Sequence, residues 1–226
     1  MKIGMIVAIV QEIKQIMNDY GNTMTTIQKN GFTVYKTTIG DNELYVTQSG
    51  AGEIGAAACA QFLITAFDVE FIVNYGVVGA LDPAFGLTES VVVKDVVHYD
   101  WDVSMIDNVP VGKYEEFESV HIPTTPKYVE MALKIDPTLR PVSCASADKF
   151  VGSAEWKKQL NQQFDCQICE MEAAAITITC KRNNVDCLLI KAVSDSAEGG
   201  AEEFTSMVER SAKNCMKVLM EIIHSL

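Results

Sequence analysis

Cys169-Glu170-Met171-Glu172-Ala173-Ala174-Ala175 joins a short apolar segment to a run of small, helix-forming residues. Two carboxylates, Glu170 and Glu172, lie at this junction, although the residues around them are suited to burial. A buried glutamate is rare unless it is paired or hydrogen-bonded. We therefore expect a polar group, such as a bound ligand, to meet at least one of the two carboxylates.

Strand-like and helix-like segments alternate on both sides of this junction. Apolar runs typical of buried strands occupy residues 2–9, 70–75, 90–97, 141–147, 166–170 and 186–193. Helices are predicted from apolar spacing and end signals at residues 11–19, 54–67, 126–134, 154–164, 171–182 and 202–223. This alternation favours an α/β fold around one mixed, mostly buried sheet.

Three shorter strands, at 23–29, 32–39 and 43–48, are predicted to form an antiparallel meander. Asn30-Gly31 and Gly40-Asp41 separate these strands, and such pairs are turn signals. In α/β folds, ligands bind at the carboxyl ends of the strands. Polar or glycine-rich residues follow several predicted strands, at Gln11-Glu12, Gly50-Ala51-Gly52, 76–79, 148–151 and Ser194-Asp195.

Composition excludes several classes of function. The net charge of −12 and the presence of only three arginines argue against nucleic-acid binding, which needs a basic surface. The odd number of cysteines, seven, with several in apolar runs, is typical of buried free thiols in a reducing cytoplasm. Cys166 and Cys169 have metal-like spacing, but no second pair follows and the histidines are scattered, so we expect no metal site. The apolar N-terminus is too short to span a bilayer, so no membrane association is expected.

Six motifs occur in order along the chain: Met1–Ala8 followed by Glu12, Ser49–Gly52, Asn74–Gly79, Ala147–Val151, Glu170–Ala174 and Val193–Asp195. With them the chain resembles the nucleoside phosphorylase superfamily, and within it the 5′-methylthioadenosine/S-adenosylhomocysteine nucleosidases. The resemblance implies one domain over residues 1–226, with three α/β/α layers and a mixed central sheet that closes partly into a barrel. It also implies a homodimer that binds a small purine nucleoside without a cofactor, with the long segment His98–Glu118 near the interface and the pocket.

The resemblance assigns catalysis to two carboxylates. Asp195 corresponds to the acid that faces the purine N7, where a proton or hydrogen bond makes the base a better leaving group. Such an acid has to stay protonated near neutral pH, and burial favours the neutral form of a carboxyl group. Glu12 corresponds to the carboxylate that activates the attacking water. Both residues also suit simple helix capping, because carboxylates are common at helix starts.

Other residues implied by the resemblance hold the sugar. Glu172 corresponds to the carboxylate that accepts hydrogen bonds from the ribose 2′- and 3′-hydroxyls. It also lies where positive charge develops on the sugar in the transition state. Met171 corresponds to the residue that packs on the sugar. Glu170, two residues before Glu172, is expected to point elsewhere.

A further set of residues corresponds to the family's base-binding region. Phe150 and Val151 correspond to the pair that sandwiches adenine and reads it with backbone groups. Gly79 corresponds to the glycine that lets the backbone approach the nucleoside. Ser194 belongs to the motif that carries the acid, and is expected to contact the substrate.

Three positions depart from the nucleosidase pattern. Lys191 stands where the family has an arginine near the water and ribose, so the charge is kept but the bidentate fork is lost. Val77 stands where a serine follows the central glycine. Gly199–Glu202 stands where the family has an aromatic cover before the last helix. These changes bear on the accepted 5′-substituent and on the rate.

Water is the predicted nucleophile. Phosphorylases of this superfamily hold phosphate with arginines near the end of the first strand and before the central glycines, but Ile9–Glu12 and Glu70–Asn74 contain none. Without a cation, a phosphate beside Glu12 is electrostatically unfavourable. We expect hydrolysis of a 6-aminopurine nucleoside, of methylthioadenosine or adenosylhomocysteine type, to free base and a ribose derivative. Two alternatives stay open: a phosphorylase that uses Lys191 for the anion, and a nucleoside-binding protein with weakened catalysis.

Overall fold

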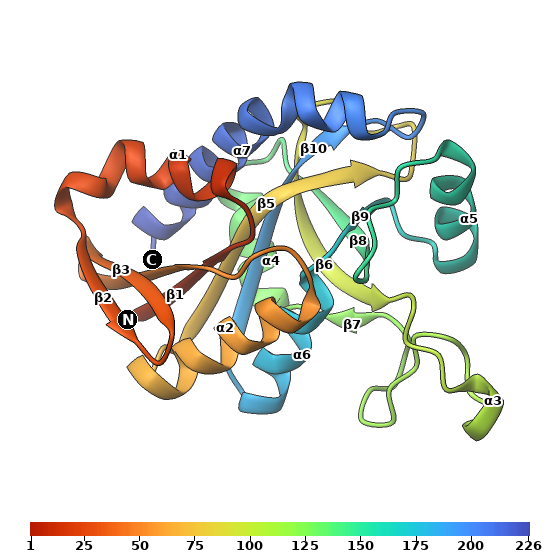
Figure 1. The fold of residues 1–226 in the computed structure, drawn as a ribbon, viewed down its shortest axis with the longest axis horizontal. Helices are drawn as coiled ribbons and strands as arrows, with labels where there is room; N and C mark the ends of the chain where they lie inside the picture. The colour runs from red at the N-terminus through yellow and green to blue at the C-terminus, as the bar shows by residue number, and fades with distance from the viewer.

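One sheet contains all ten strands of the protein, and part of it closes on itself (Figure 1). The computed structural model describes residues 1–226. The strands are β1 (Lys2–Val7), β2 (Thr25–Lys29), β3 (Phe32–Ile39), β4 (Asn42–Gln48), β5 (Phe71–Ala80), β6 (Ser90–His98), β7 (Ile122–Pro123), β8 (Arg140–Ser146), β9 (Ile168–Glu170) and β10 (Asp186–Asp195). Their order is β10-β6-β8-β9-β5-β1-β4-β3-β2, with β7 beside β6.

The closed part of the sheet arises because β10 pairs with both β6 and β5. The ring β10-β6-β8-β9-β5 contains parallel and antiparallel pairs, and β1 continues from it in parallel with β5. In this ring Gly79 of β5 is opposite both Asp195 of β10 and Cys169 of β9. The mixed, partly barrel-like sheet confirms the predicted fold class, and its closure brings the ends of distant strands together.

Helices cover both faces of the sheet. They are α1 (Val10–Tyr20), α2 (Glu53–Phe67), the short α3 (Ser104–Asp107), α4 (Pro126–Ile135), α5 (Ala154–Phe164), α6 (Ala173–Asn183) and α7 (Ala201–His224). One apolar cluster contains Leu63 of α2 and Ile176 of α6, and a second contains Ile16 of α1 and Leu219 of α7. Figure 1 shows these two pairs on opposite sides of the strands. The three predicted layers follow from the two clusters.

The meander is confirmed, since β2, β3 and β4 pair antiparallel in sequence. At the tip between β2 and β3, Asn30 and Gly31 have φ of 51° and 84°. Both residues of a tight hairpin turn need a positive φ, and Asn-Gly supplies it at low cost. The Asn-Gly pair therefore determined this hairpin locally.

Two predicted element ends are wrong, and both lie at the ring. Strand β5 does not stop at 76–79 but continues to Ala80, because these residues pair with β10 along their whole length. Strand β10 likewise continues to Asp195, and α7 begins only at Ala201. Asp195 is therefore not a helix cap. Apolar patterning underestimated both strands because glycine and polar residues can remain in a strand that lines a cavity.

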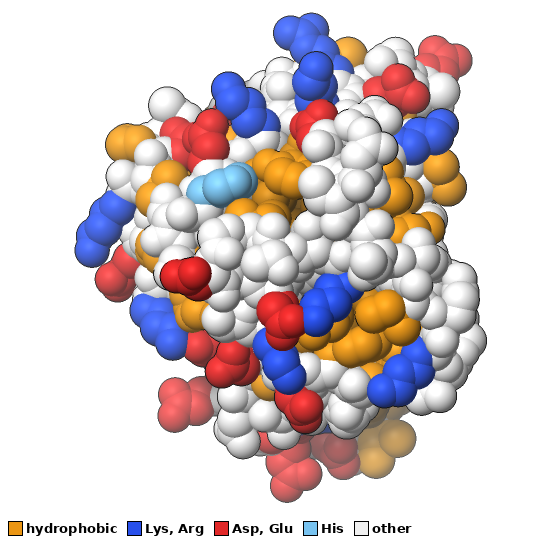
Figure 2. Space-filling model, turned by 90° about the vertical axis from the view of Figure 1, so that its left-hand side faces the viewer, with side chains coloured by type: hydrophobic (Ala, Val, Ile, Leu, Met, Phe, Trp, Pro, Cys, Tyr) orange, Lys and Arg blue, Asp and Glu red, His pale blue; other side chains and the backbone are white.

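Charge is dispersed over the face that carries β2 and β3. Figure 2 looks onto that side and shows acidic and basic side chains interspersed, with apolar side chains visible between them. All seven cysteines are free and buried, as their apolar surroundings predicted. None of the helices combines the length and hydropathy that crossing a bilayer requires.

Candidate active site

A cavity of about 240 Å³ opens at the carboxyl ends of β1, β5, β9 and β10. Seven of the nine predicted site residues line it: Glu12, Gly79, Phe150, Met171, Glu172, Ser194 and Asp195. The other lining residues are Ala8, Ile9, Ala51, Val77, Val78, Cys169, Glu170 and Phe204. The fold therefore assembles residues from all six sequence motifs, including Ala51 from the Ser49–Gly52 motif.

Glu12 is held in place by three backbone donors. The N–H groups of Ala8 and Ile9 donate to Oε2 at 2.8 and 3.0 Å, and the N–H of Val77 donates to Oε1 at 3.1 Å. Glu12 is the third residue of α1, and its bond from Ile9 caps that helix. Burial raises the pKa of Glu12, against the backbone bonds and the charge of Lys191, which lower it. The capping role and the position in the cavity thus coexist in one carboxylate suited to accept a proton.

Val77 makes its contact with Glu12 through the backbone, so the loss of the family's serine at this position leaves that contact intact. A side chain two positions further along β5 would interfere. A Cβ on Gly79 would lie 2.9 Å from Asp195 Oδ2 and 3.2 Å from Cys169 Sγ, and a Cβ on Gly76 would lie 2.7 Å from Glu12 Oε1. The glycines of β5 therefore make room for both candidate catalytic carboxylates.

Asp195 has a partner on each oxygen. Lys157 Nζ of α5 donates to Oδ2 at 2.5 Å, and Ser194 Oγ lies 2.9 Å from Oδ1. Both Lys157 and Asp195 are buried. Sequence reasoning placed no cation beside this acid, and the buried ammonium of Lys157 is a close counter-charge for it.

Glu172 precedes α6 and turns its carboxylate towards the glycine turn before α2. The N–H of Gly52 donates to Glu172 Oε1 at 2.7 Å. Burial, together with the charge of Glu170, raises the pKa of Glu172 to about 8. Its second oxygen has no recorded partner within the protein, so it is available to a hydroxyl group of a ligand.

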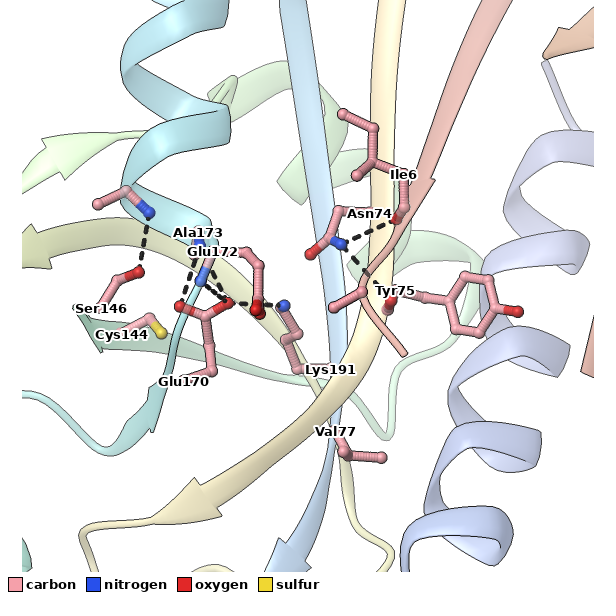
Figure 3. Close-up of polar contacts among 12 residues, drawn as sticks. Ile6, Asn74, Tyr75, Val77, Cys144, Ser146, Glu170, Glu172, Ala173 and Lys191 are labelled. Atoms are coloured by element: carbon pink, nitrogen blue, oxygen red, sulfur yellow. Dashed lines mark hydrogen bonds and ion pairs between the residues drawn. The ribbon is translucent and has the colours of Figure 1, made fainter. Parts of the chain in front are cut away.

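Of the two carboxylates Glu170 and Glu172, Glu170 has the structural role (Figure 3). Lys191 Nζ donates to Glu170 Oε2 at 3.0 Å, and the N–H groups of Glu172 and Ala173 donate to the same carboxylate. Burial disfavours its charge, but the Lys191 ammonium and these bonds hold the pKa of Glu170 below its ordinary value. Glu170 therefore anchors the first turn of α6.

Lys191 does not line the cavity, although we predicted that it binds substrate. Burial works against its charge, but the carboxylates of Glu170 and Glu172 outweigh that effect and raise its pKa. A lysine cannot make the two parallel hydrogen bonds of an arginine. The ammonium group of Lys191 donates to Glu170. Its positive charge lowers the pKa of the cavity carboxylates Glu12 and Glu172, against the effect of burial.

Glu53 adds a fifth buried carboxyl group behind the cavity wall, close to Glu170. Ser146 Oγ and the N–H of Ala175 both approach it at 2.5 Å. Burial and the nearby charge of Glu170 raise the pKa of Glu53 to about 9. The group is therefore neutral at physiological pH, which limits the electrostatic repulsion within the cluster.

Aromatic residues border the cavity on the side of α7. The rings of Phe150 and Phe204 pack edge to face, with centroids 5.6 Å apart. Phe204 lies in the first turns of α7, so an aromatic residue borders the cavity from within the helix and not from Gly199–Glu202 at its start. Val151 packs in the core with Leu160 and does not line the cavity, although we predicted that it contacts the base.

Sequence reasoning missed Lys157, the partner of Asp195. A signal was present, because Lys157, Leu160 and Phe164 are spaced at i, i+3 and i+7, and all three are buried on one face of α5. A lysine on an apolar helix face is rarely buried without a buried acid to meet it. No group of three or more His, Cys, Asp or Glu side chains is arranged to hold a metal ion.

Comparisons with known proteins identify relatives along the whole length of the chain. A 5′-methylthioadenosine/S-adenosylhomocysteine nucleosidase of Staphylococcus aureus (strain bovine RF122 / ET3-1) is 29% identical over 233 residues, covering 99% of this chain and 100% of that protein. The native structure of futalosine hydrolase of Helicobacter pylori strain 26695 is 27% identical, with a TM-score of 0.94 over 100% of this chain and 98% of that one.

The structure of a 5′-methylthioadenosine/S-adenosylhomocysteine nucleosidase from Helicobacter pylori with butyl-thio-DADMe-Immucillin-A is 28% identical to this chain. Its TM-score is 0.94 over 100% of this chain and 98% of that one. The sequence profile of the phosphorylase superfamily matches residues 2–224. A profile match over nearly the whole chain, together with the ring-shaped sheet and its cavity, leads to one conclusion: the chain belongs to the phosphorylase superfamily.

Proposed function

We propose that this chain hydrolyses the N-glycosidic bond of a 6-aminopurine nucleoside, of methylthioadenosine or adenosylhomocysteine type, and releases free base and a ribose derivative. The observation that carries the proposal is the placement of Glu12 and Asp195 on one cavity, with Glu172 also on its wall. The nucleosidase names of the relatives from Staphylococcus aureus and Helicobacter pylori support it.

The spacing of the two carboxylates suits attack by water. Glu12 Oε1 lies against Gly76 and Asp195 Oδ2 against Gly79, three residues further along β5. Three residues of strand span roughly 10 Å. A separation of this size leaves room for a water and a sugar between the two groups, whereas a nucleophilic carboxylate of a glycosidase lies only about 5 Å from its acid. Glu12 then takes a proton from the water, while the electrons of the breaking bond pass to the purine beside Asp195.

Phosphate fits this cavity poorly. None of its lining residues is a lysine or an arginine, and three of them are glutamates. The two lysines behind the wall, Lys157 and Lys191, are committed to Asp195 and Glu170. A phosphate anion would therefore meet carboxylates without a free cation, which favours hydrolysis over phosphorolysis.

A product assay tests the proposed reaction. We expect methylthioadenosine to give adenine and methylthioribose at equal rates with and without phosphate, because water is the nucleophile. Chromatography with mass detection identifies the sugar. A sugar 1-phosphate that forms only with phosphate present would establish a phosphorylase, and tight binding without turnover would establish a nucleoside-binding protein.

The 5′-substituent is chosen by the apolar part of the cavity. Ile9, Ala51 and Phe204 line it without a charged group, which favours an alkylthio or otherwise apolar 5′-group over a phosphate. Adenosylhomocysteine and futalosine, the latter suggested by the name of one Helicobacter pylori relative, belong in the same assay. Their relative kcat/KM values show which 5′-substituent the enzyme prefers.

We further propose that the protein is a cytoplasmic homodimer and that α3 takes part in the interface. Figure 1 shows the segment around α3 projecting from the body of the molecule. It presents Met105 and Ile106 with 96% and 83% of their surfaces exposed. Two adjacent exposed apolar side chains on a projecting arm are typical of an interaction surface, and a second copy of the chain is the occupant implied by the family resemblance.

The double substitution Met105→Glu/Ile106→Glu is expected to convert the dimer into a monomer, because it places charge in an apolar contact. Analytical ultracentrifugation reads the mass directly. Lys217→Glu, an exposed charge change on α7, should leave the dimer unchanged. A wild-type monomer, or a dimer that survives the double substitution, would rule out this interface.

A further inference from the structure

Lys157 is fully buried and its ammonium has two partners. Its side chain is 0% exposed, and Nζ donates to Asp195 Oδ2 at 2.5 Å and to the carbonyl of Ser196 at 2.6 Å. An ammonium group is expensive to bury, and the cost is offset only by a close and well-bonded counter-charge. Its neighbours on the same face of α5, Leu160 and Phe164, are apolar. Packing alone therefore gives no reason for a lysine at this position.

Both oxygens of Asp195 have hydrogen-bond partners within the protein. An ionised carboxylate only accepts hydrogen bonds, and Oδ2 is occupied by the Lys157 ammonium. Oδ1 faces Ser194 Oγ, whose single hydrogen serves either Asp195 or the carbonyl of Val78, 3.2 Å away. The Lys157–Asp195 pair as a whole holds one transferable proton, and it is stored on nitrogen.

Two other titratable groups face this pair, and neither supplies a proton near neutral pH. Burial raises the pKa of Cys169, from β9, to about 12, so it remains a thiol. Glu203, from α7, accepts the N–H of Ser196, and this bond lowers its pKa, so it is ionised. Lys157 is thus the proton donor in direct contact with Asp195.

We propose that Lys157 is a positioning and proton-storing residue for the leaving-group acid, so that the acid is the pair Lys157–Asp195 and not Asp195 alone. The inference rests on the proposed nucleosidase function. As the C1′–N9 bond breaks, its electrons move into the purine ring. The proton of a Lys157 N–H bond moves to Asp195 Oδ2 and from the carboxyl group to N7, which leaves a neutral amine beside a carboxylate. The attacking water gives its proton to Glu12, and exchange with solvent restores both groups.

The test compares Lys157→Gln, Asp195→Asn and the double variant in the full chain. Glutamine keeps a hydrogen bond to Asp195 but has neither the charge nor an acidic proton. We expect Lys157→Gln to lower kcat on methylthioadenosine about 100-fold, as loss of a general acid does, with KM nearly unchanged. The double variant should be no slower than Asp195→Asn.

A matched control is Lys158→Gln, which changes the exposed lysine next in sequence and should behave as wild type. Lys157→Met provides a second variant if glutamine impairs folding, which thermal denaturation reports. Wild-type kcat from Lys157→Gln, or a kcat of the double variant reduced by the product of the single losses, would overturn the inference and give Lys157 a merely structural role.

Failure of the proposed function has a different signature, namely a wild-type protein that releases no base from any nucleoside. In that case the adenine affinity of the same proteins, measured by calorimetry, still tests whether Lys157 and Asp195 act as a pair. We expect Lys157→Gln and Asp195→Asn to weaken adenine binding by similar factors that do not multiply in the double variant. Unchanged adenine affinity in Lys157→Gln would count against the pair even without turnover.

Discussion

Glu12→Gln is expected to lower kcat by about 10²–10⁴-fold, the usual contribution of a general base, while KM changes little. The carboxylate is the group placed to take the proton of the attacking water. Glutamine keeps the shape of the side chain but cannot accept that proton. The loss should therefore appear in the chemical step and not in nucleoside binding.

The effect should be this large because the surrounding backbone groups fix the orientation of the Glu12 carboxylate and burial raises its pKa. Three backbone N–H groups fix both oxygens, and burial raises its pKa. A raised pKa makes the ionised form a stronger base, and fixed geometry removes the cost of orienting it during reaction. We expect the wild-type rate to fall at acidic pH as Glu12 takes up a proton, at a pH above that of an ordinary glutamate.

Steady-state kinetics of adenine release measures this prediction. Asp19→Asn, an exposed acid-to-amide change on the same helix, serves as the matched control and should keep the wild-type rate. An amide at position 12 also turns an NH2 group towards backbone donors, so thermal denaturation should accompany the kinetics. A folded Glu12→Gln protein with the wild-type kcat would remove Glu12 from the mechanism.

Glu172→Gln is expected to lower kcat/KM by about 10²–10³-fold, in line with the loss of a group that stabilises developing charge. One oxygen of Glu172 is fixed by Gly52, and the carboxylate lines the cavity. In the proposed complex it accepts hydrogen bonds from the ribose hydroxyls and faces the cationic sugar of the transition state. Glutamine accepts with one oxygen only and carries no charge.

The pH dependence separates this role from a packing effect. The pKa of Glu172 is raised to about 8 by burial and by Glu170, so the ionised form gains population as pH rises through that value. Wild-type kcat/KM should therefore increase between neutral pH and about 8, where the clamp becomes charged. The charged neighbours Lys191, Glu12 and Glu170 remain in the variant, yet this increase should vanish.

Profiles of kcat/KM against pH for wild type, Glu172→Gln and the exposed control Glu202→Gln decide the point. The control should reproduce the wild-type profile. A rise near pH 8 that persists in Glu172→Gln would assign the titration to another group, of which Glu53, with a pKa of about 9, is the nearest candidate.

The sequence alone predicted most of the elements and the hairpin at Asn30-Gly31, and the family resemblance of its motifs named both candidate catalytic carboxylates. Those features depend on patterns that lie within a few residues of one another: apolar periodicity, turn residues and short motifs. Lys191 illustrates the limit, because its charge was visible in the sequence but its partner was not. It points behind the cavity to Glu170, since a single buried ammonium pairs with the nearest buried carboxylate.

Only the tertiary structure showed that Glu170 and Glu172 have different roles and that Lys157 is the partner of Asp195. Glu172 meets Gly52, 120 residues away, and Lys157 meets Asp195, 38 residues away. These contacts depend on the closure of the sheet through β10 and on the packing of α5 against its end. Local sequence carries no information on such distances, because closure and strand register are set by the packing of the whole core. The sequence therefore determined which side chains are available, and the fold determined which of them share a proton.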